Sequence, residues 1–203
     1  MDTLPEEVQE NILLSLVEPD DLFRACSTSR ESRNICSGSA FWREKFAREG
    51  LPLLQEGHTF TAWISIYKKA FRAAQIADRL VDSGEDILIR MSEIFDLRHL
   101  GFYIDSRVMG IWQEAREGDS YAHHNYIDEE GQEHHVSIRD DFYLVFTPSS
   151  DIYTMSIVNY EVTTDNQEET ISQTLVPSRF TLKLEAKDMW RVVYNVAFFG
   201  YHF

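Results

Sequence analysis

The first fifty residues combine apolar positions at helical spacing with polar residues suited to helix ends. Apolar side chains recur every three or four positions, the period of one helix face, at Val8, Ile12, Leu13 and Leu16. Thr3 and Glu6 have the spacing of a capping box, so we expect a helix to begin at about Leu4. Pro19 interrupts the pattern and ends this helix.

Three more short helices are predicted before residue 52. Asp20 and Asp21 suit the first turn of a second helix, where carboxylates interact favourably with the helix dipole. Residues 28–31, Thr-Ser-Arg-Glu, repeat the capping-box spacing and open a third helix. Ser39 caps a fourth, which stops at Gly50.

A longer helix follows, and the pattern then changes. Residues 61–82 carry apolar side chains along one face, and the helix ends at Asp82-Ser83-Gly84. Residues 85–97 fit one more helix. Beyond them the runs are typical of strands: 101–104, 108–114, 121–127, 134–138, 142–146, 153–163 and 170–175.

The last segment, residues 190–199, is compatible with a strand or a helix, and the acidic residues before it and Gly200 after it favour the helix. The apolar end, 198–203, needs covering by this fold or by a neighbour. The fold class we predict is α+β: a helical module at 1–52, a connecting helix at 53–83, and a mostly antiparallel sheet domain at 84–203.

The sheet domain is far more acidic than the helices. Residues 84–203 hold 21 acidic and 9 basic side chains, a net charge of -12, whereas residues 1–83 have a net charge of -3. Such a field repels phosphate backbones and anionic lipid, so we expect no nucleic-acid and no membrane partner. The domain is more suited to binding a protein.

Location and redox state are expected to be those of an intracellular protein. The chain has no apolar run of the roughly 18 residues that a membrane span needs, and its start lacks the features of a secretory signal. Cys26 and Cys36 form no ligand motif, and we interpret them as reduced thiols in the core.

The N-terminal pattern resembles a known family, the F-box, a helical module that docks substrate receptors onto the Skp-type adaptor of cullin-RING ubiquitin ligases. The resemblance is carried, in order, by Leu4-Pro5, Glu7-Val8, Ile12-Leu13, Leu16, Asp21-Leu22, Ala25-Cys26, Ser29-Arg30 and Phe41-Trp42-Arg43. The module looks like the compact variants of large DNA viruses. It departs from the usual pattern at residues 27–33, which lack a Trp.

The resemblance implies an adaptor-binding surface. The residues that pack on the adaptor or support that packing would be Leu4, Pro5, Val8, Ile12, Leu13 and Leu16, with Leu22 and Trp42 completing the helical core. Fifty residues bury too little apolar surface alone, so a partner would cover the open face. Residues 60–83 of the same chain could cover it instead.

A histidine-rich stretch at 123–135 reads as a β-hairpin turning at Asp-Glu-Glu-Gly, with Gly131 at positive φ. Two registers suit this hairpin best: the numbers of the paired residues sum to 258 in one and to 260 in the other. Either register puts two imidazoles on each face, and two imidazoles with a carboxylate can hold zinc. The candidate metal ligands are His123, His124, His134 and His135. The alternative is a solvated hairpin that binds no metal.

No motif of catalysis is found: there is no phosphate-binding glycine loop, dinucleotide fingerprint, zinc-protease pair or nucleophile elbow. We expect neither an enzyme nor a cofactor. The leading hypothesis is an adaptor in the host cytoplasm or nucleus. The alternative is a structural or assembly protein of a large DNA virus particle, located in the virion, whose neighbour would be another particle protein. A metal-dependent enzyme is a third possibility.

Overall fold

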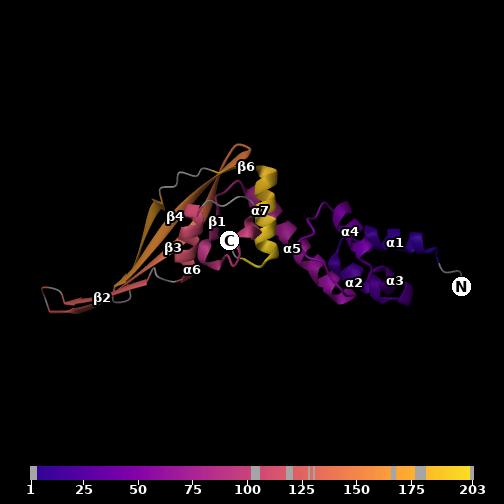
Figure 1. Ribbon diagram of the computed structural model, residues 1–203, viewed down its shortest axis with the longest axis horizontal. Helices are drawn as coiled ribbons and strands as arrows, with labels where there is room; N and C mark the ends of the chain where they lie inside the picture. The colour runs from indigo at the N-terminus through magenta and orange to yellow at the C-terminus, as the bar shows by residue number, and fades with distance from the viewer. Residues whose placement is uncertain are drawn as a thin grey trace. The chain divides into compact units, whose positions relative to one another are not determined.

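The structure is a computed structural model that describes residues 4–101, 106–117, 121–127, 129, 131–165, 168–176 and 182–201. It divides into two compact units, unit 1 at Met1–Ile76 and unit 2 at Ala77–Phe203. The division falls inside the long helix, before the turn at Gly84. The fold class is α+β, as predicted (Figure 1).

Unit 1 is helical. Its helices are α1 (Glu6–Ser15), α2 (Pro19–Ser27), α3 (Arg30–Ile35), α4 (Ser39–Arg48) and the first part of α5 (Phe60–Ser83). The expected long helix at 61–82 is therefore confirmed to within a residue at each end. Among the residues that the structure describes, no helix is both long and apolar enough to cross a membrane.

The helix caps differ from the expected ones. Extended Pro5 stands at the N-cap of α1, so the helix begins two residues later than predicted, and Thr3 lies outside the described residues. Ser29, rather than Thr28, caps α3 by accepting a hydrogen bond from the amide of Ser32 at 3.0 Å. Gly38, rather than Ser39, is the N-cap of α4.

Unit 2 is built around one antiparallel sheet. Its strands are β1 (Ile87–Arg90), β2 (Tyr121–Ile127), β3 (Glu133–Ser149), β4 (Ile152–Asp165), β5 (Glu168–Val176) and β6 (Lys183–Glu185). The order is β1-β3-β4-β5, with β2 beside β3 and β6 beside β4. The long pair β3 and β4 turns tightly at Ser150, a non-glycine residue at φ 57°.

Two segments of unit 2 contradict the sequence prediction. The helix expected at 85–97 is the strand β1 followed by the short 3-10 helices η1 (Met91–Glu93) and η2 (Leu97–Leu100). Its alternation is that of a strand, because Ile87 and Ile89 are buried and their neighbours are not. The strand expected at 108–114 is the helix α6 (Ser106–Glu117), and the strand expected at 101–104 falls mostly outside the described residues.

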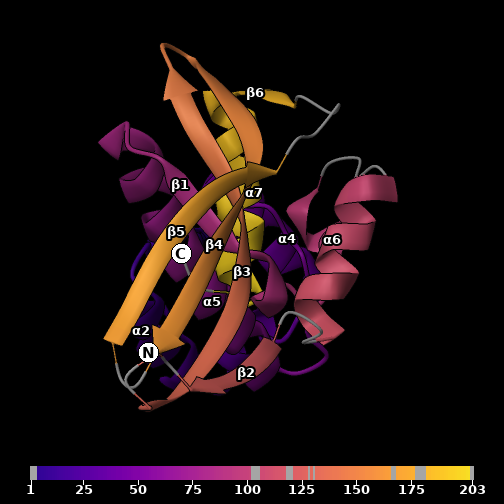
Figure 2. The ribbon, with the colours of Figure 1, turned by 90° about the vertical axis from the view of Figure 1, so that its left-hand side faces the viewer.

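The core of unit 2 lies between the sheet and the helix α7 (Ala186–Phe198), which Figure 2 shows behind the strands. Leu144 and Ile157 pair across β3 and β4, and both are fully buried. Phe146 pairs with Met155 on one side and Ile87 on the other, on the same face. The preference for a helix at 190–199 is confirmed, with Gly200 at φ 84° ending it.

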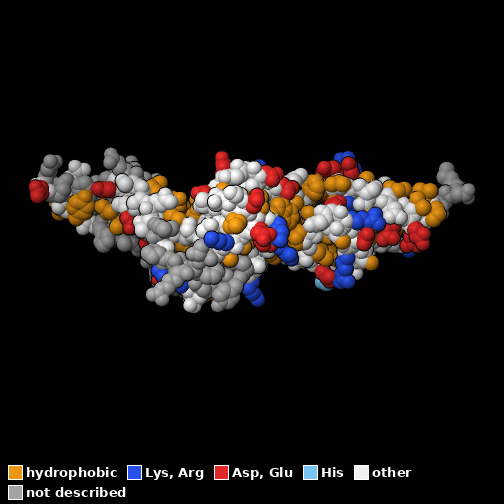
Figure 3. Space-filling view, turned by 90° about the horizontal axis from the view of Figure 1, so that it is seen from above, with side chains coloured by type: hydrophobic (Ala, Val, Ile, Leu, Met, Phe, Trp, Pro, Cys, Tyr) orange, Lys and Arg blue, Asp and Glu red, His pale blue; other side chains and the backbone are white. Residues whose placement is uncertain are grey.

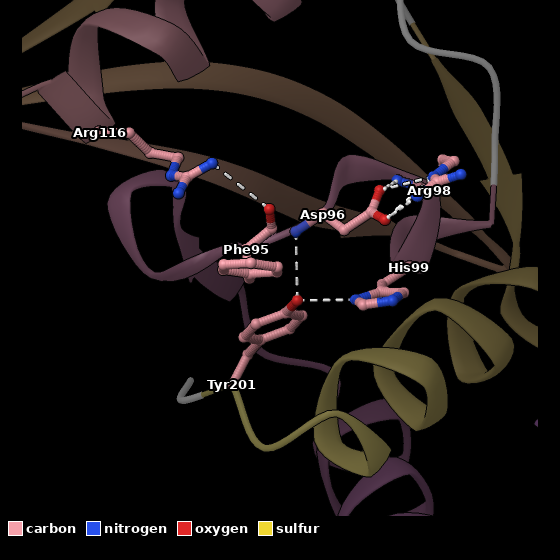
Figure 4. A network of polar contacts seen from close by, with 6 residues as sticks. All are labelled: Phe95, Asp96, Arg98, His99, Arg116 and Tyr201. Carbon is pink, nitrogen blue, oxygen red and sulfur yellow. Dashed lines mark hydrogen bonds and ion pairs between the residues drawn. The ribbon is translucent and has the colours of Figure 1, made fainter. Parts of the chain in front are cut away.

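The end of the chain is held by a polar network (Figure 4). The hydroxyl of Tyr201 lies 2.7 Å from Nδ1 of His99 and accepts a 3.3 Å hydrogen bond from the amide of Asp96. The ring of Phe199 stacks on His99 with 3.5 Å between centroids. Arg98 beside Asp96 lowers the pKa of that carboxyl to about 2. Residues 198–201 are therefore covered by the fold itself and need no neighbouring protein.

Acidification should weaken this anchor. Burial lowers the pKa of His99 below its unfolded value of about 6.5, so the unfolded chain binds more protons. The free energy of unfolding should therefore be fully maintained above pH 6.5 and fall as the pH drops below it. Urea unfolding at pH 7.5 and 5.5 measures this, and His99→Gln should lose less stability than wild type over that interval. An equal loss in both proteins would contradict the prediction.

Candidate docking surface on the N-terminal helices

The first helix and the residue before its N-cap expose one apolar row, and the helix buries another. Leu4, Val8 and Ile12, spaced four residues apart, are 55, 43 and 49% exposed. Leu13 and Leu14 face inward and are 3 and 5% exposed. We call Leu4, Val8 and Ile12 the exposed row. Figure 3 shows apolar side chains gathered on the surface of the N-terminal helices.

A hollow of about 440 Å³ lies beside the exposed row, between α1 and α3. It is lined by Leu4, Pro5, Glu6, Gln9, Glu31, Asn34 and Ile35. Ile35 is only partly buried, and Leu4 and Pro5 are exposed. An apolar side chain of another protein could therefore enter the hollow while its backbone lies along the exposed row.

A buried lysine holds the end of α1 in place. Lys45 on α4 is fully buried, and its ammonium donates to the carbonyl oxygens of Leu14 at 3.1 Å and Leu16 at 2.5 Å. It also forms an ion pair with Glu49. These bonds satisfy carbonyls that the helix end leaves free, and they fix the helix that carries the exposed row.

Tyr67 on α5 completes this cluster. Its hydroxyl lies 2.6 Å from the carbonyl oxygen of Val17 and 2.7 Å from Oε2 of Glu49, and it shares its proton between these acceptors. Burial, helped by the hydrogen bond with Glu49, raises the pKa of Tyr67. The phenol therefore stays neutral and supplies a hydrogen bond at every physiological pH.

The connecting helix packs on α4 and leaves the exposed row open. Trp63 stacks on Trp42 with 5.9 Å between ring centroids, and Tyr67 meets the rings of Trp42 and Phe46. Trp42 also donates from Nε1 to the carbonyl of Cys36 at 2.7 Å. Residues 60–76 thus cover the α4 side of unit 1, while Leu4, Val8 and Ile12 keep about half of their surface in solvent.

Comparison with known protein families agrees with this arrangement. Residues 1–48 match the F-box-like family. The match covers 48 of the 203 residues and takes in α1 to α4, which carry the exposed row and its buried support. No curated protein and no solved structure shows significant similarity to the chain.

The residues expected at the adaptor-binding site of the F-box-like module separate into exposed, partly buried and buried positions. Four are exposed and can contact a partner: Leu4, Pro5, Val8 and Ile12. Leu16 is partly buried. Leu13, Leu22 and Trp42 are at most 3% exposed, so they support the surface from inside. Lys45 was missed by sequence reasoning, and its only signal was the four-residue spacing to Glu49, which is usually an exposed pair.

The two cysteines are not reduced thiols. Cys26, in α2, and Cys36, after α3, form a disulfide with 6.0 Å between their Cα atoms. Both side chains are fully buried, so the expectation of a core position holds and that of free thiols does not. The reversal of the chain at Ser29 brings the ends of the two helices together, and Cα distances in this range suit a disulfide.

The histidine-rich hairpin forms with the register that sums to 260, because His123 pairs with Ser137 and Asn125 with His135. Gly131 has the expected positive φ of 84°. The side chains of the four histidines lie outside what the structure describes. Within the described part of the chain, no group of three or more His, Cys, Asp or Glu is placed to hold a metal ion.

Proposed function

We propose that the chain is an F-box-like adaptor that docks on a Skp-type protein and presents a second protein to a cullin-RING ubiquitin ligase. One observation carries the proposal: a module matched by the F-box-like family keeps Leu4 exposed just before α1 and Val8 and Ile12 exposed on it, with the end of α1 held by Lys45. The acidic unit 2 would hold the protein that is presented.

Burial of the exposed row would supply the affinity. Fully covering a Val or Ile side chain is worth about 1.5–3 kcal/mol. Val8 and Ile12 are already about half buried, so covering the rest of both is worth about 1.5–3 kcal/mol in total, and losing it weakens binding by about 10–150-fold. An aspartate at each position weakens binding further, because its charge would have to be desolvated. The hollow beside Ile35 would add a pocket for one side chain of the adaptor.

The proposal requires a cytoplasmic or nuclear location, where disulfides are usually reduced. The bond between Cys26 and Cys36 is compatible with that setting because both sulfurs are fully buried. A reductant reaches them only when α2 and α3 open locally.

The test is binding of purified Skp-type adaptor to the intact chain and to Val8→Asp/Ile12→Asp, measured by calorimetry. We expect sub-micromolar to micromolar binding by wild type and a loss of at least about 100-fold in the double variant. Both side chains are exposed, so the variant should keep its fold. Leu13 is unsuitable for this purpose, because a charge at a buried position would unfold the module.

Ile152→Asp is the matched control, since Ile152 in unit 2 is 43% exposed and Ile12 is 49% exposed. It should bind the adaptor like wild type. Circular dichroism on heating checks that all three proteins are folded. Equal binding by wild type and the double variant, or no binding by wild type, would refute the proposal.

A further inference from the structure

The sheet of unit 2 has a second face, turned away from α7. Cross-strand pairing places Tyr143 opposite Val158, Asp141 opposite Tyr160, and Arg139 opposite Val162 on this face. Leu88 on β1 and Ile171 on β5 extend it in both directions, because they pair with Val145 and Val162. This face is therefore largely apolar and aromatic from β1 to β5.

The face is concave. Leu88 and Ile171 line one hollow of about 380 Å³, although their strands lie on opposite sides of the β3 and β4 pair. The hollow therefore extends across β3 and β4. Val145 and Val158, on the same face, are 7 and 4% exposed. We call this hollow the trough; its lining is Leu88, Arg139, Asp141, Tyr143, Tyr160, Val162 and Ile171.

The trough has the make-up of a recognition site. The rings of Tyr143 and Tyr160 meet edge to face, with 5.2 Å between centroids and an interplanar angle of 82°, so each fixes the other. Ile171 at the rim is 64% exposed. Binding pockets are typically 300–1,000 Å³, mostly apolar and aromatic, with a few fixed polar groups.

The charges in the trough favour a carboxylate. The side chain of Asp141 is 12% exposed and forms two ion pairs. Its Oδ1 lies 2.5 Å from Nη2 of Arg90, and its Oδ2 lies 3.1 Å from Nη2 of Arg139. Arg90 also lies 3.7 Å from Glu93, so two guanidinium groups face two carboxylates here. The Arg139 side chain stays 48% exposed, and a guanidinium has five N–H donors. Arg139 is thus the more exposed of the two charged side chains in the lining, within a unit that is strongly acidic.

The edges of the trough favour a polypeptide over a small molecule. β1 and β5 are the ends of the strand path, so among the described residues no strand pairs with their outer edges. Such edges offer rows of backbone donors and acceptors, which an extended peptide satisfies by adding a strand.

We propose that the trough binds an extended segment of a partner protein that carries a large apolar side chain next to an Asp or Glu. The apolar side chain fills the space between Leu88 and Ile171, over the two tyrosine rings. The carboxylate pairs with Arg139. This inference rests on the proposed function, because the segment would belong to the protein presented to the ligase.

The test uses the full-length chain and a positional-scanning library of capped seven-residue peptides. Wild type should select Leu, Ile, Met or Phe at one position and Asp or Glu within two positions of it. Ile171→Asp should bind the best peptide at least tenfold more weakly, and the equally polar change Ile152→Asp should bind it like wild type. Arg139→Glu should replace the preference for Asp or Glu by one for Lys or Arg.

Three outcomes would overturn the inference. Wild type selects no peptide; Ile171→Asp selects the same peptides with the same affinity; or Arg139→Glu leaves the charge preference unchanged. Sedimentation of wild type as a dimer that Ile171→Asp dissociates would also overturn it, by assigning the trough to a second copy of the chain.

The adaptor site is tested separately. Val8→Asp/Ile12→Asp should lose the adaptor and keep the peptide preference. A chain that selects peptides as described but never binds the adaptor refutes the proposed function alone. A chain that binds the adaptor but selects no peptide refutes this inference alone.

Discussion

Replacement of Lys45 by methionine should lower the free energy of unfolding of unit 1 by about 3–5 kcal/mol. The change keeps most of the side-chain volume but removes the one charge that, among the described residues, is paired with the largely buried Glu49. It also leaves the carbonyl oxygens of Leu14 and Leu16 without their buried donor. Urea unfolding followed by near-ultraviolet circular dichroism, which reports the stacked Trp42 and Trp63, measures the effect.

The double variant Lys45→Met/Glu49→Gln separates lost charge pairing from lost packing. Neutralising Glu49 removes the unpaired charge, so about 1–2 kcal/mol of the stability should return. A single variant as stable as wild type would show that Lys45 does not hold the end of α1. The exposed row would then have to be positioned by the buried leucines alone.

Replacement of Phe146 by alanine should destabilise unit 2 by about 3–5 kcal/mol. Phe146 is fully buried and lies between Ile87 on β1 and Met155 on β4. Its removal leaves a cavity where three strands meet the helix side of the core. Urea unfolding of the full chain, followed by hydrogen exchange of the β4 amides, measures the loss.

Thr147→Ala is the matched control for Phe146→Ala. Thr147 is the next residue on the same strand and points to the opposite, exposed side. Its replacement should change the free energy of unfolding by about 0.5 kcal/mol or less. Similar effects of the two substitutions would contradict the assignment of inner and outer faces, on which the trough also depends.

Long periodic segments were predicted well because many residues carry the same signal. The helix α5 keeps a consistent pattern over 24 residues, and the strands β4 and β5 lie within two residues of the predicted bounds. The errors fell on residues 85–97 and 108–114. Val108 and Ile111 are buried three residues apart, as in a helix, but their β-branched side chains suggested a strand.

The candidate site was partly predictable. Leu4, Val8 and Ile12 follow a helical period, but the same period includes buried Leu13, and only packing shows which residues face solvent. Lys45 could not be identified, because a lysine is buried only where specific carbonyls and a carboxylate receive it. The pairing of Cys26 with Cys36 likewise depends on how α2 and α3 pack. The trough depends on the pairing of β1, β3, β4 and β5, which a linear pattern does not contain.

The tight turn at Ser150 also bears on how unit 2 assembles. Fourteen residue pairs join β3 to β4, and each forms a slightly larger loop than the pair before it. The loop-closure entropy of each step is therefore small. The pairing of β1 with β3 instead closes a long loop, because most of the first half of unit 2 lies between Ile87 and Phe146 in the sequence. The central strands β3 and β4 therefore pair through residues that are close in sequence. The edge strand β1 pairs with residues that are distant in sequence, so most of the loop-closure entropy is lost when it joins the sheet.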